Sequence, residues 1–379
     1  MERMGVYSTI HHPSAKRLQV VKERIKDFEF EVIENIDDAW TALDTGDLDL
    51  ILAPANIVWN ERVKLASMQF DVIAALTRNH PHHVLVSEDG LEHFPAGGVI
   101  LCEEPLISRQ IKRRRAKIDI RTYASMEIES DTTEGLHTAQ NLVESGEING
   151  FVTHRGAYDS AGLNGRRHAL HNDPEARGVP RFVPIPFCDL IVVISRQGYP
   201  VHNISDWTDE HALNAWMVQR TVMHRTPVEL HELIGVHYRQ QQIGPILTEA
   251  ERVNDLFVLD NLIDPEGDVD DEPRYEIIVE LLSEDGLRTT SMERIGPINR
   301  LDIDIQFMMN DWNNLLERFM AKEGGSSDLN PASSLTLRTA RWPSYGAEDI
   351  QWLRGGTSTL RGIHGGRGRP SGGYPDRPT

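Results

Sequence analysis

Short apolar strands alternate with segments of helical periodicity through the first part of this 379-residue chain, and this order limits its fold more than any other feature. Met4–Thr9, Phe30–Ile33 and Leu48–Leu52 have the pattern of strands. Between them lie a helix that Pro13 opens and a short helix around Trp40, both with apolar residues at helical spacing. A β-α-β-α-β order predicts a mostly parallel sheet.

Further strands are predicted over Phe70–Leu76 and His83–Val86, and a second α/β unit is expected to begin near Val99. The elements predicted there are a basic helix over Ser108–Ile118, a strand over Ile120–Ala124, a helix to Val143 opened by a capping box at Asp131–Glu134, and a strand over Gly150–Thr153. The run Arg181–Ile194 is apolar without polar alternation. That pattern is typical of strands buried on both faces of a sheet.

Beyond about residue 205 the pattern changes to that of an α+β domain. Ala212–Met223, Val228–Leu233 and Ile305–Met320 are predicted to be helices, and Tyr275–Leu282 and Leu287–Arg294 to be strands. The two strands flank Ser283-Glu284-Asp285-Gly286, which is a good hairpin signal.

From Gly324 onward, glycine, serine, proline and arginine dominate. Such a composition buries too little apolar surface to offset chain entropy, so residues 324–379 are predicted to be a mostly disordered tail. Interleaved arginine and glycine can bind RNA weakly, so an RNA-associated protein is one hypothesis for function, in addition to the two given below. A solubilising tail is the simpler interpretation.

Charge and cysteine content limit the class of protein. The formal net charge of −19 makes nucleic acid an unlikely partner. Two cysteines, Cys102 and Cys188, cannot form a disulfide framework, and both are expected to be buried. No stretch is apolar enough to cross a bilayer, and the N-terminus leads into a strand without an apolar signal region, so a cytoplasmic protein is expected.

Several segments match one known family in order and spacing. Gly46-Asp47-Leu48-Asp49 resembles a Gly-Glu-x-Asp strand, and Leu106–Gln110 resembles Ser-Leu-Arg-Arg-Gln. The other matching segments are Arg78–Pro81, Val84–Ser87, Phe94–Ile100, Leu142–Val152, Ala161–Leu163 and Leu190–Ile194. Together they resemble porphobilinogen deaminase, also called hydroxymethylbilane synthase, an enzyme of tetrapyrrole biosynthesis.

The resemblance implies two α/β domains arranged as in periplasmic binding proteins, with a central cleft and a small α+β third domain. Residues 1–98 with 188–205 would form the first domain, 99–187 the second and 206–323 the third. The segment Cys188–Ser195 would return the chain to the first domain.

The chain departs from the family where the family does its chemistry. In the loop expected over Ala53–Ile57, after the Leu48–Leu52 strand, Asn56 falls on the family's lysine and Ile57 on its catalytic aspartate, and isoleucine cannot exchange protons. Ser108 replaces one of two tandem arginines, whereas Arg109 keeps the other. The family attaches a dipyrromethane cofactor to a cysteine in a turn of its third domain, and His237 stands at that position. No bound cofactor is therefore expected.

Two hypotheses follow from the resemblance and the departures. The first is a divergent hydroxymethylbilane synthase that uses another base or a noncovalent primer. The second is a non-catalytic protein whose cleft binds a small anion or pyrrole carboxylate near His12, Asn56, Arg109 and Gln110. No catalytic residue is assigned, and the oligomeric state is left open.

The run His80-Pro81-His82-His83 raises the question of a transition metal. Close histidines bind zinc or nickel only when geometry and neighbouring groups hold them, and the sequence offers no third spaced ligand. A surface turn set by Pro81 is therefore preferred over a metal site.

Overall fold

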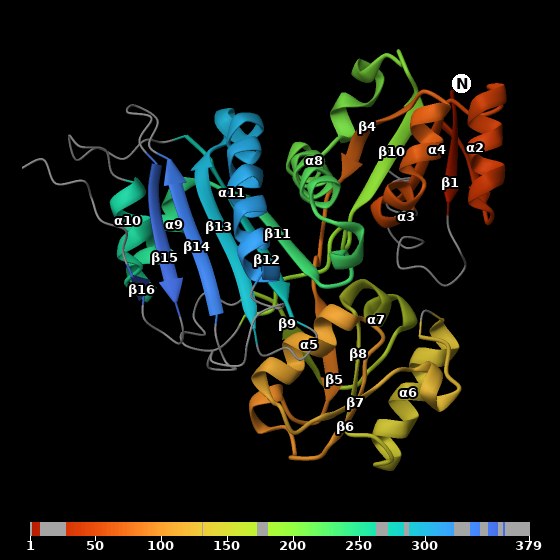
Figure 1. Cartoon of the computed structure of the whole chain (residues 1–379). Helices are drawn as coiled ribbons and strands as arrows, with labels where there is room; N and C mark the ends of the chain where they lie inside the picture. Colours follow the sequence, from red (N-terminus) through yellow and green to blue (C-terminus); the bar gives the residue numbers. More distant parts are fainter. Residues whose placement is uncertain are drawn as a thin grey trace, which may run out of the picture.

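The computed structural model describes residues 2–7, 28–130, 132–172, 181–262, 272–283 and 288–321, and the backbone of three strands within 334–360. It contains three sheets, each with its own helices (Figure 1). We call these three units the first, second and third domains. The predicted helix at Pro13 and the candidate residue His12 lie outside the described residues.

The first domain has a five-stranded sheet in the order β2-β1-β3-β10-β4. Its elements are β1 (Glu2–Tyr7), β2 (Phe28–Ile33), α2 (Ile36–Thr45), β3 (Leu50–Pro54), α3 (Ala55–Asn60), α4 (Arg62–Ser67), β4 (Phe70–Leu76) and β10 (Ile191–Arg196). β1 pairs in parallel with β2 and β3, as the alternation predicts. β10 inserts antiparallel between β3 and β4, which confirms the predicted return of the chain.

The second domain has a mixed sheet in the order β7-β6-β8-β5-β9. Its elements are β5 (His83–Ser87), β6 (Val99–Leu101), α5 (Pro105–Arg114), β7 (Asp119–Arg121), α6 (Thr133–Ser145), β8 (Gly150–His154), α7 (Arg155–Ala161) and β9 (Arg167–Leu170). Thr132 caps α6, where its side chain accepts a hydrogen bond from the Gly135 amide at 3.0 Å.

The boundary expected at residue 98 is wrong, because β5 belongs to the second sheet. β5 pairs antiparallel with β8 and with β9. The chain therefore leaves the first sheet after Leu76 and enters the second at His83. We call residues 77–82 the first crossing segment and residues 181–190 the second crossing segment.

The third domain has a six-stranded sheet in the order β11-β12-β13-β14-β15-β16. Its elements are α8 (Glu210–Arg225), β11 (Ile234–Gln241), α9 (Ile243–Val253), α10 (Leu256–Leu262), β12 (Arg274–Leu282), β13 (Thr289–Pro297), α11 (Leu301–Ala321), β14 (Ser334–Arg341), β15 (Glu348–Arg354) and β16 (Thr359–Leu360). β12 and β13 form the predicted antiparallel hairpin. The last three strands come from the segment predicted to be mostly disordered, and the remainder of that segment lies outside the described residues.

Two local predictions in these domains are wrong. The segment Ala53–Ile57 was expected to be a loop, but β3 ends at Pro54 and α3 starts at Ala55. The helix expected over Val228–Leu233 is a single 3-10 turn, Val228–Leu230, followed by β11. Gly235 lets β11 approach the second crossing segment, since a Cβ there would lie 2.9 Å from atoms of Val183.

One apolar core joins the first and third domains. Buried residues of β3, β10, α2 and α3 form a single cluster with those of α8, α11, β11 and β12. Phe187 of the second crossing segment lies at its centre, with ring centroids 5.6 Å from Trp59 and 5.3 Å from Trp216. In the described residues, the apolar clusters of the second domain contain no residue of the third domain's sheet or helices.

We expect Trp216→Ala to lower the free energy of unfolding by about 3–5 kcal/mol, because a buried indole between two domains is replaced by a cavity. Urea unfolding followed by circular dichroism measures the loss, and hydrogen exchange should show weaker protection in both β3 and β12. Val63→Ala, at a position 75% exposed, is the control and should change stability by less than about 0.5 kcal/mol. Weaker protection in β12 alone would contradict a shared core.

Candidate functional site

Of the sequence-predicted site residues that the structure describes, one lies in the first domain and two in the second. Asn56 lies in the first turn of α3 in the first domain and is exposed. Arg109 and Gln110 lie on α5 in the second domain, where their hydrogen bonds are directed to other segments. Arg109 Nη1 donates to the carbonyl oxygen of Leu282 at 3.3 Å, and Gln110 Nε2 donates to that of Val183 at 2.9 Å.

These two contacts give α5 a structural task. Gln110 is fully buried, so its amide holds the second crossing segment against the helix. Arg109 reaches the last residue of β12 in the third domain. Both side chains therefore fasten α5 to its neighbours, which differs from the ligand-binding task that the sequence suggested.

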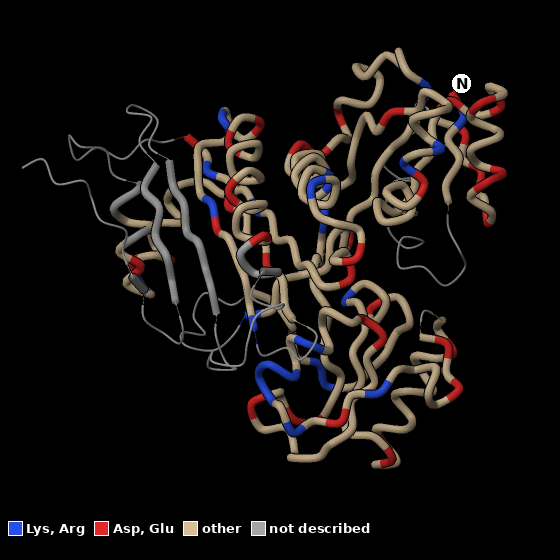
Figure 2. The backbone as a smooth tube through the Cα atoms, in the orientation of Figure 1, with Lys and Arg blue, Asp and Glu red and all other residues tan. Residues whose placement is uncertain are grey.

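More basic residues lie at the end of α5 and just after it, in a stretch of the backbone coloured blue in Figure 2. Arg113 pairs with Glu280 of β12 at 3.0 Å, and Arg114 pairs with Glu92. Arg115 donates to the carbonyl oxygen of Phe94. Lys112 and Lys117 are exposed to solvent. The basic run thus divides between internal contacts and water, and it forms no continuous cationic face toward one ligand.

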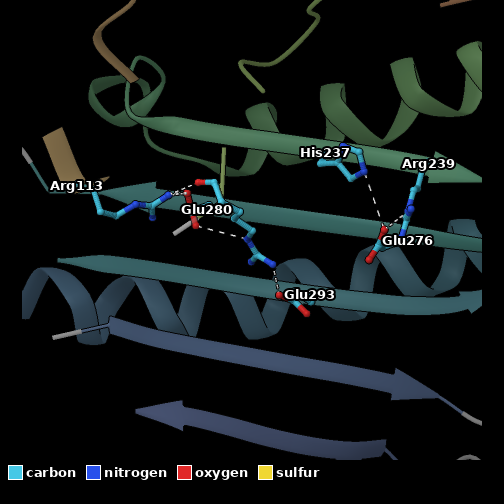
Figure 3. A network of polar contacts seen from close by, with 7 residues as sticks. Arg113, His237, Arg239, Glu276, Glu280 and Glu293 are labelled. Carbon is cyan, nitrogen blue, oxygen red and sulfur yellow. Dashed lines mark hydrogen bonds and ion pairs between the residues drawn. The ribbon is translucent and has the colours of Figure 1, made fainter. Parts of the chain in front are cut away.

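His237, at the suspected cysteine position, lies in the middle of strand β11 and points along the sheet toward Glu276 (Figure 3). Its Nε2 lies 4.0 Å from Glu276 Oε2. Burial, followed by the positive charges of Arg239, Arg78, Arg181 and His171, lowers the pKa of His237 to about 3. The imidazole is therefore neutral near pH 7, and this contact is no ion pair.

The two crossing segments are joined by Asp189. Its Oδ2 accepts hydrogen bonds from the amides of Asn79 at 2.8 Å and His80 at 2.6 Å. Asp189 has a φ of 57° and Phe187 a φ of 63°, the left-handed region that costs non-glycine residues roughly 1–3 kcal/mol each. The Phe187 amide donates to Gln219 Oε1, so α8 helps to hold this conformation.

Histidines gather where the first crossing segment meets the second domain. The His82 ring centroid lies 6.0 Å from that of His80 and 5.8 Å from that of His171. Burial, and then the charges of His171, His80 and Arg155, lower the pKa of His82 to about 4 against a smaller opposing effect of Asp189. His83 packs edge-on to His154, and burial is the main cause of its pKa of about 3.

His171 links His82 of the first crossing segment to His237 of β11, because its charge acts on both side chains. We call Arg78, His82, His171, Arg181 and His237 the junction cluster. It draws on both crossing segments, on His171 just after β9 of the second domain and on β11 of the third domain. Each of its members is cationic or can become so. Burial is the main cause that disfavours protons on His82 and His237, and the neighbouring positive charges add to it.

Redox, thiol and metal chemistry receive little support from this arrangement. Cys102 and Cys188 are buried, as predicted, and burial raises the pKa of the Cys102 thiol to about 12. In the part of the chain that the structure describes, no three His, Cys, Asp or Glu side chains are grouped so that they could hold a metal ion. Among the same residues, no helix is both long and apolar enough to cross a membrane.

Sequence reasoning missed most of the junction cluster. Arg78 begins the family-matching segment Arg78–Pro81, but that match alone does not mark it as a site residue. His171 and Arg181 carry no local motif, and they lie close to His237 only because the second crossing segment packs against β11.

We expect stability to fall as the pH is lowered from 7 to 5. The pKa of His83 is about 3 in the folded state, against 6.5 for a histidine side chain exposed to water, so the unfolded chain takes up the proton first. Above about pH 7.5 His83 is neutral in both states and does not lower the free energy of unfolding. By pH 5, protonation of His83 in the unfolded chain has lowered the free energy of unfolding by roughly 2 kcal/mol.

His83→Gln should therefore flatten the dependence of unfolding free energy on pH, measured by urea denaturation at several pH values. His93→Gln, an exposed histidine of the same domain, is the matched control and should keep the wild-type slope. Equal slopes for wild type and His83→Gln would contradict the burial of a neutral imidazole at position 83.

Among known proteins, no family model matches the chain. Solved structures with similarity include a periplasmic substrate-binding protein of an ABC transporter from Coxiella burnetii, with a TM-score of 0.34 and 13% identity over 57% of this chain and 95% of that one. A nutrient-binding protein from Burkholderia cenocepacia bound to methionine has a TM-score of 0.33 and 12% identity, over 60% of this chain and 96% of that one.

One curated relative is similar in sequence. It is the probable porphobilinogen deaminase of Picrophilus torridus, 22% identical over 174 residues, which are 46% of this chain. The chain spans 56% of the length of that relative. The similarity to porphobilinogen deaminase therefore extends over less than half of this chain, in a molecule with two mixed α/β domains and a third α+β domain.

Proposed function

We propose that this chain is a binding protein for a small anionic ligand, on a scaffold related to porphobilinogen deaminase, and that it does not carry out pyrrole polymerisation. The observation that carries the proposal is the junction cluster, where cationic and protonatable side chains of the crossing segments and of the second and third domains act on two histidines that are neutral near pH 7. A bound anion would oppose the charges that lower the pKa of those histidines. The ligand would therefore bind together with protons.

Three observations support the absence of the family reaction. The start of α3 carries Asn56 and Ile57 where a lysine and a proton-transferring aspartate are expected. Both cysteines are buried, and neither belongs to an element of the third domain. His237 lies within a strand as a neutral imidazole, and it does not provide the thiol to which the family attaches its cofactor.

The competing hypothesis is a divergent hydroxymethylbilane synthase, which the similarity to the Picrophilus torridus protein favours. Incubation of the purified protein with porphobilinogen separates the two. We expect no uroporphyrin after acid oxidation, no loss of substrate above a heat-killed control, and an intact mass equal to that of the bare chain. Turnover, or an added mass of bound pyrroles, would refute the non-catalytic proposal.

Anion binding is tested on the junction cluster itself. Isothermal titration with porphobilinogen and, separately, with inorganic phosphate should detect binding that strengthens from pH 8 to pH 6. Arg78→Gln should weaken binding of the better probe at least tenfold, about 1.4 kcal/mol, because one cation at the site is removed. Arg220→Gln, an exposed arginine of α8, makes the same charge change away from the cluster and should leave the affinity unchanged.

Proton uptake provides the second measurement. Titrations in buffers of different ionisation enthalpy should give net proton uptake on binding near pH 6, because the anion stabilises the protonated histidines. Binding without proton uptake, or an equal loss of affinity in both arginine variants, would place the ligand elsewhere. No binding of either probe at millimolar concentration would overturn the proposal.

A further inference from the structure

The third domain is attached to its two neighbours by different kinds of contact. Its attachment to the second domain centres on Glu280 of β12, which is 2% exposed (Figure 3). Glu280 Oε1 lies 3.0 Å from Arg113 Nη2 of α5, and Glu280 Oε2 lies 3.7 Å from Arg181 Nε of the second crossing segment. One carboxylate therefore joins the second domain and the second crossing segment to the third domain.

Further polar contacts complete this network. Arg181 also pairs with Glu293 of β13, while Arg113 donates to Thr289 Oγ1 at 3.1 Å and to the carbonyl oxygen of Arg181. We call Arg113, Arg181, Glu280 and Glu293 the charge network. It holds two guanidiniums and two carboxylates, so its charges are balanced while the domains are together.

The third domain is attached to the first domain mainly by apolar packing. The shared apolar core continues from α3 through Phe187 to α8 and the third sheet. α8 also packs along β4, and the amide of Asp209 donates to the carbonyl oxygen of Ala75 at 2.9 Å. Separating the first and third domains would expose to water the part of this core that lies between them.

The two kinds of contact respond differently to separation. Exposed apolar surface is unfavourable in proportion to its area, at roughly 25 cal/mol per Å². Buried ion pairs regain hydration when they separate, and for that reason their net contribution to a closed state is often close to zero. The charge network is therefore the weaker of the two attachments, although its geometry is specific.

We propose that the first and third domains form one fixed unit, and that the second domain opens away from it when the charge network separates. The charge network acts as the latch of the closed state, and the crossing segments are the hinge. This inference is independent of the proposed ligand, since the opening is measured on the protein alone.

Distances between spin labels test the proposal on the full chain. One label at Val63→Cys in the first domain is paired with a second at Lys117→Cys in the second domain or at Ile303→Cys in the third. All three positions are exposed, whereas the native Cys102 and Cys188 are buried. Pulsed electron spin resonance then gives one distance distribution for each pair.

Glu280→Gln leaves two buried guanidiniums with one carboxylate. We expect it to lengthen and broaden the distribution between positions 63 and 117, and to leave that between positions 63 and 303 unchanged. Glu249→Gln is the control: Glu249 of α9 pairs with Arg239, which also pairs with Glu276, all within the third domain. It should leave both distributions as in the wild type.

A folded Glu280→Gln protein with an unchanged distribution between positions 63 and 117 would overturn the proposal. Equal changes in both distributions would overturn it too, because the first and third domains would then not be one unit. If Glu280→Gln does not fold, Arg113→Gln is the substitute, since Arg181 stays near both carboxylates. It should shift the distribution between positions 63 and 117 in the same direction by a smaller amount, and no shift would count against the latch.

Discussion

The second crossing segment is the constraint on which the arrangement of the three domains depends. From the second domain, Gln110 donates a hydrogen bond to this segment. From the third domain, the amide of Val236 in β11 donates to the carbonyl oxygen of Pro184 at 2.9 Å. Phe187 then enters the apolar core that the first and third domains share. Because one short segment contacts all three domains, its conformation determines how they meet. The left-handed backbone at Phe187 and Asp189 is maintained by these contacts.

Electrostatics links the junction cluster to the charge network through Arg181. Its guanidinium pairs with Glu280 and Glu293, and its charge also helps to keep His237 neutral. The two proposals therefore share one side chain. An anion at the junction cluster would compete with the two glutamates for Arg181, so ligand binding and domain opening would be thermodynamically coupled in both directions.

Local patterns in the sequence predicted most of the elements, and pairing over long distances explains the errors. The parallel strands β1, β2 and β3, the β12–β13 hairpin and α11 follow from periodicity and turn residues that lie within each segment. β5 was recognised as a strand but assigned to the wrong domain, since its partners β8 and β9 lie far along the chain. The hydrogen bonds of Arg109 and Gln110 could not be predicted for the same reason, because only the packing of α5 shows which atoms their side chains reach.

The position of β10 also affects how the chain can fold. The first sheet is incomplete until β10 inserts between β3 and β4, whereas every strand of the second sheet lies within one continuous stretch of sequence between β4 and β10. During synthesis the second domain can therefore complete its sheet while the first still has an open gap. Such long-range pairing slows folding, because the loop must close before its contacts form. The first domain thus depends on a neighbour that folds before it.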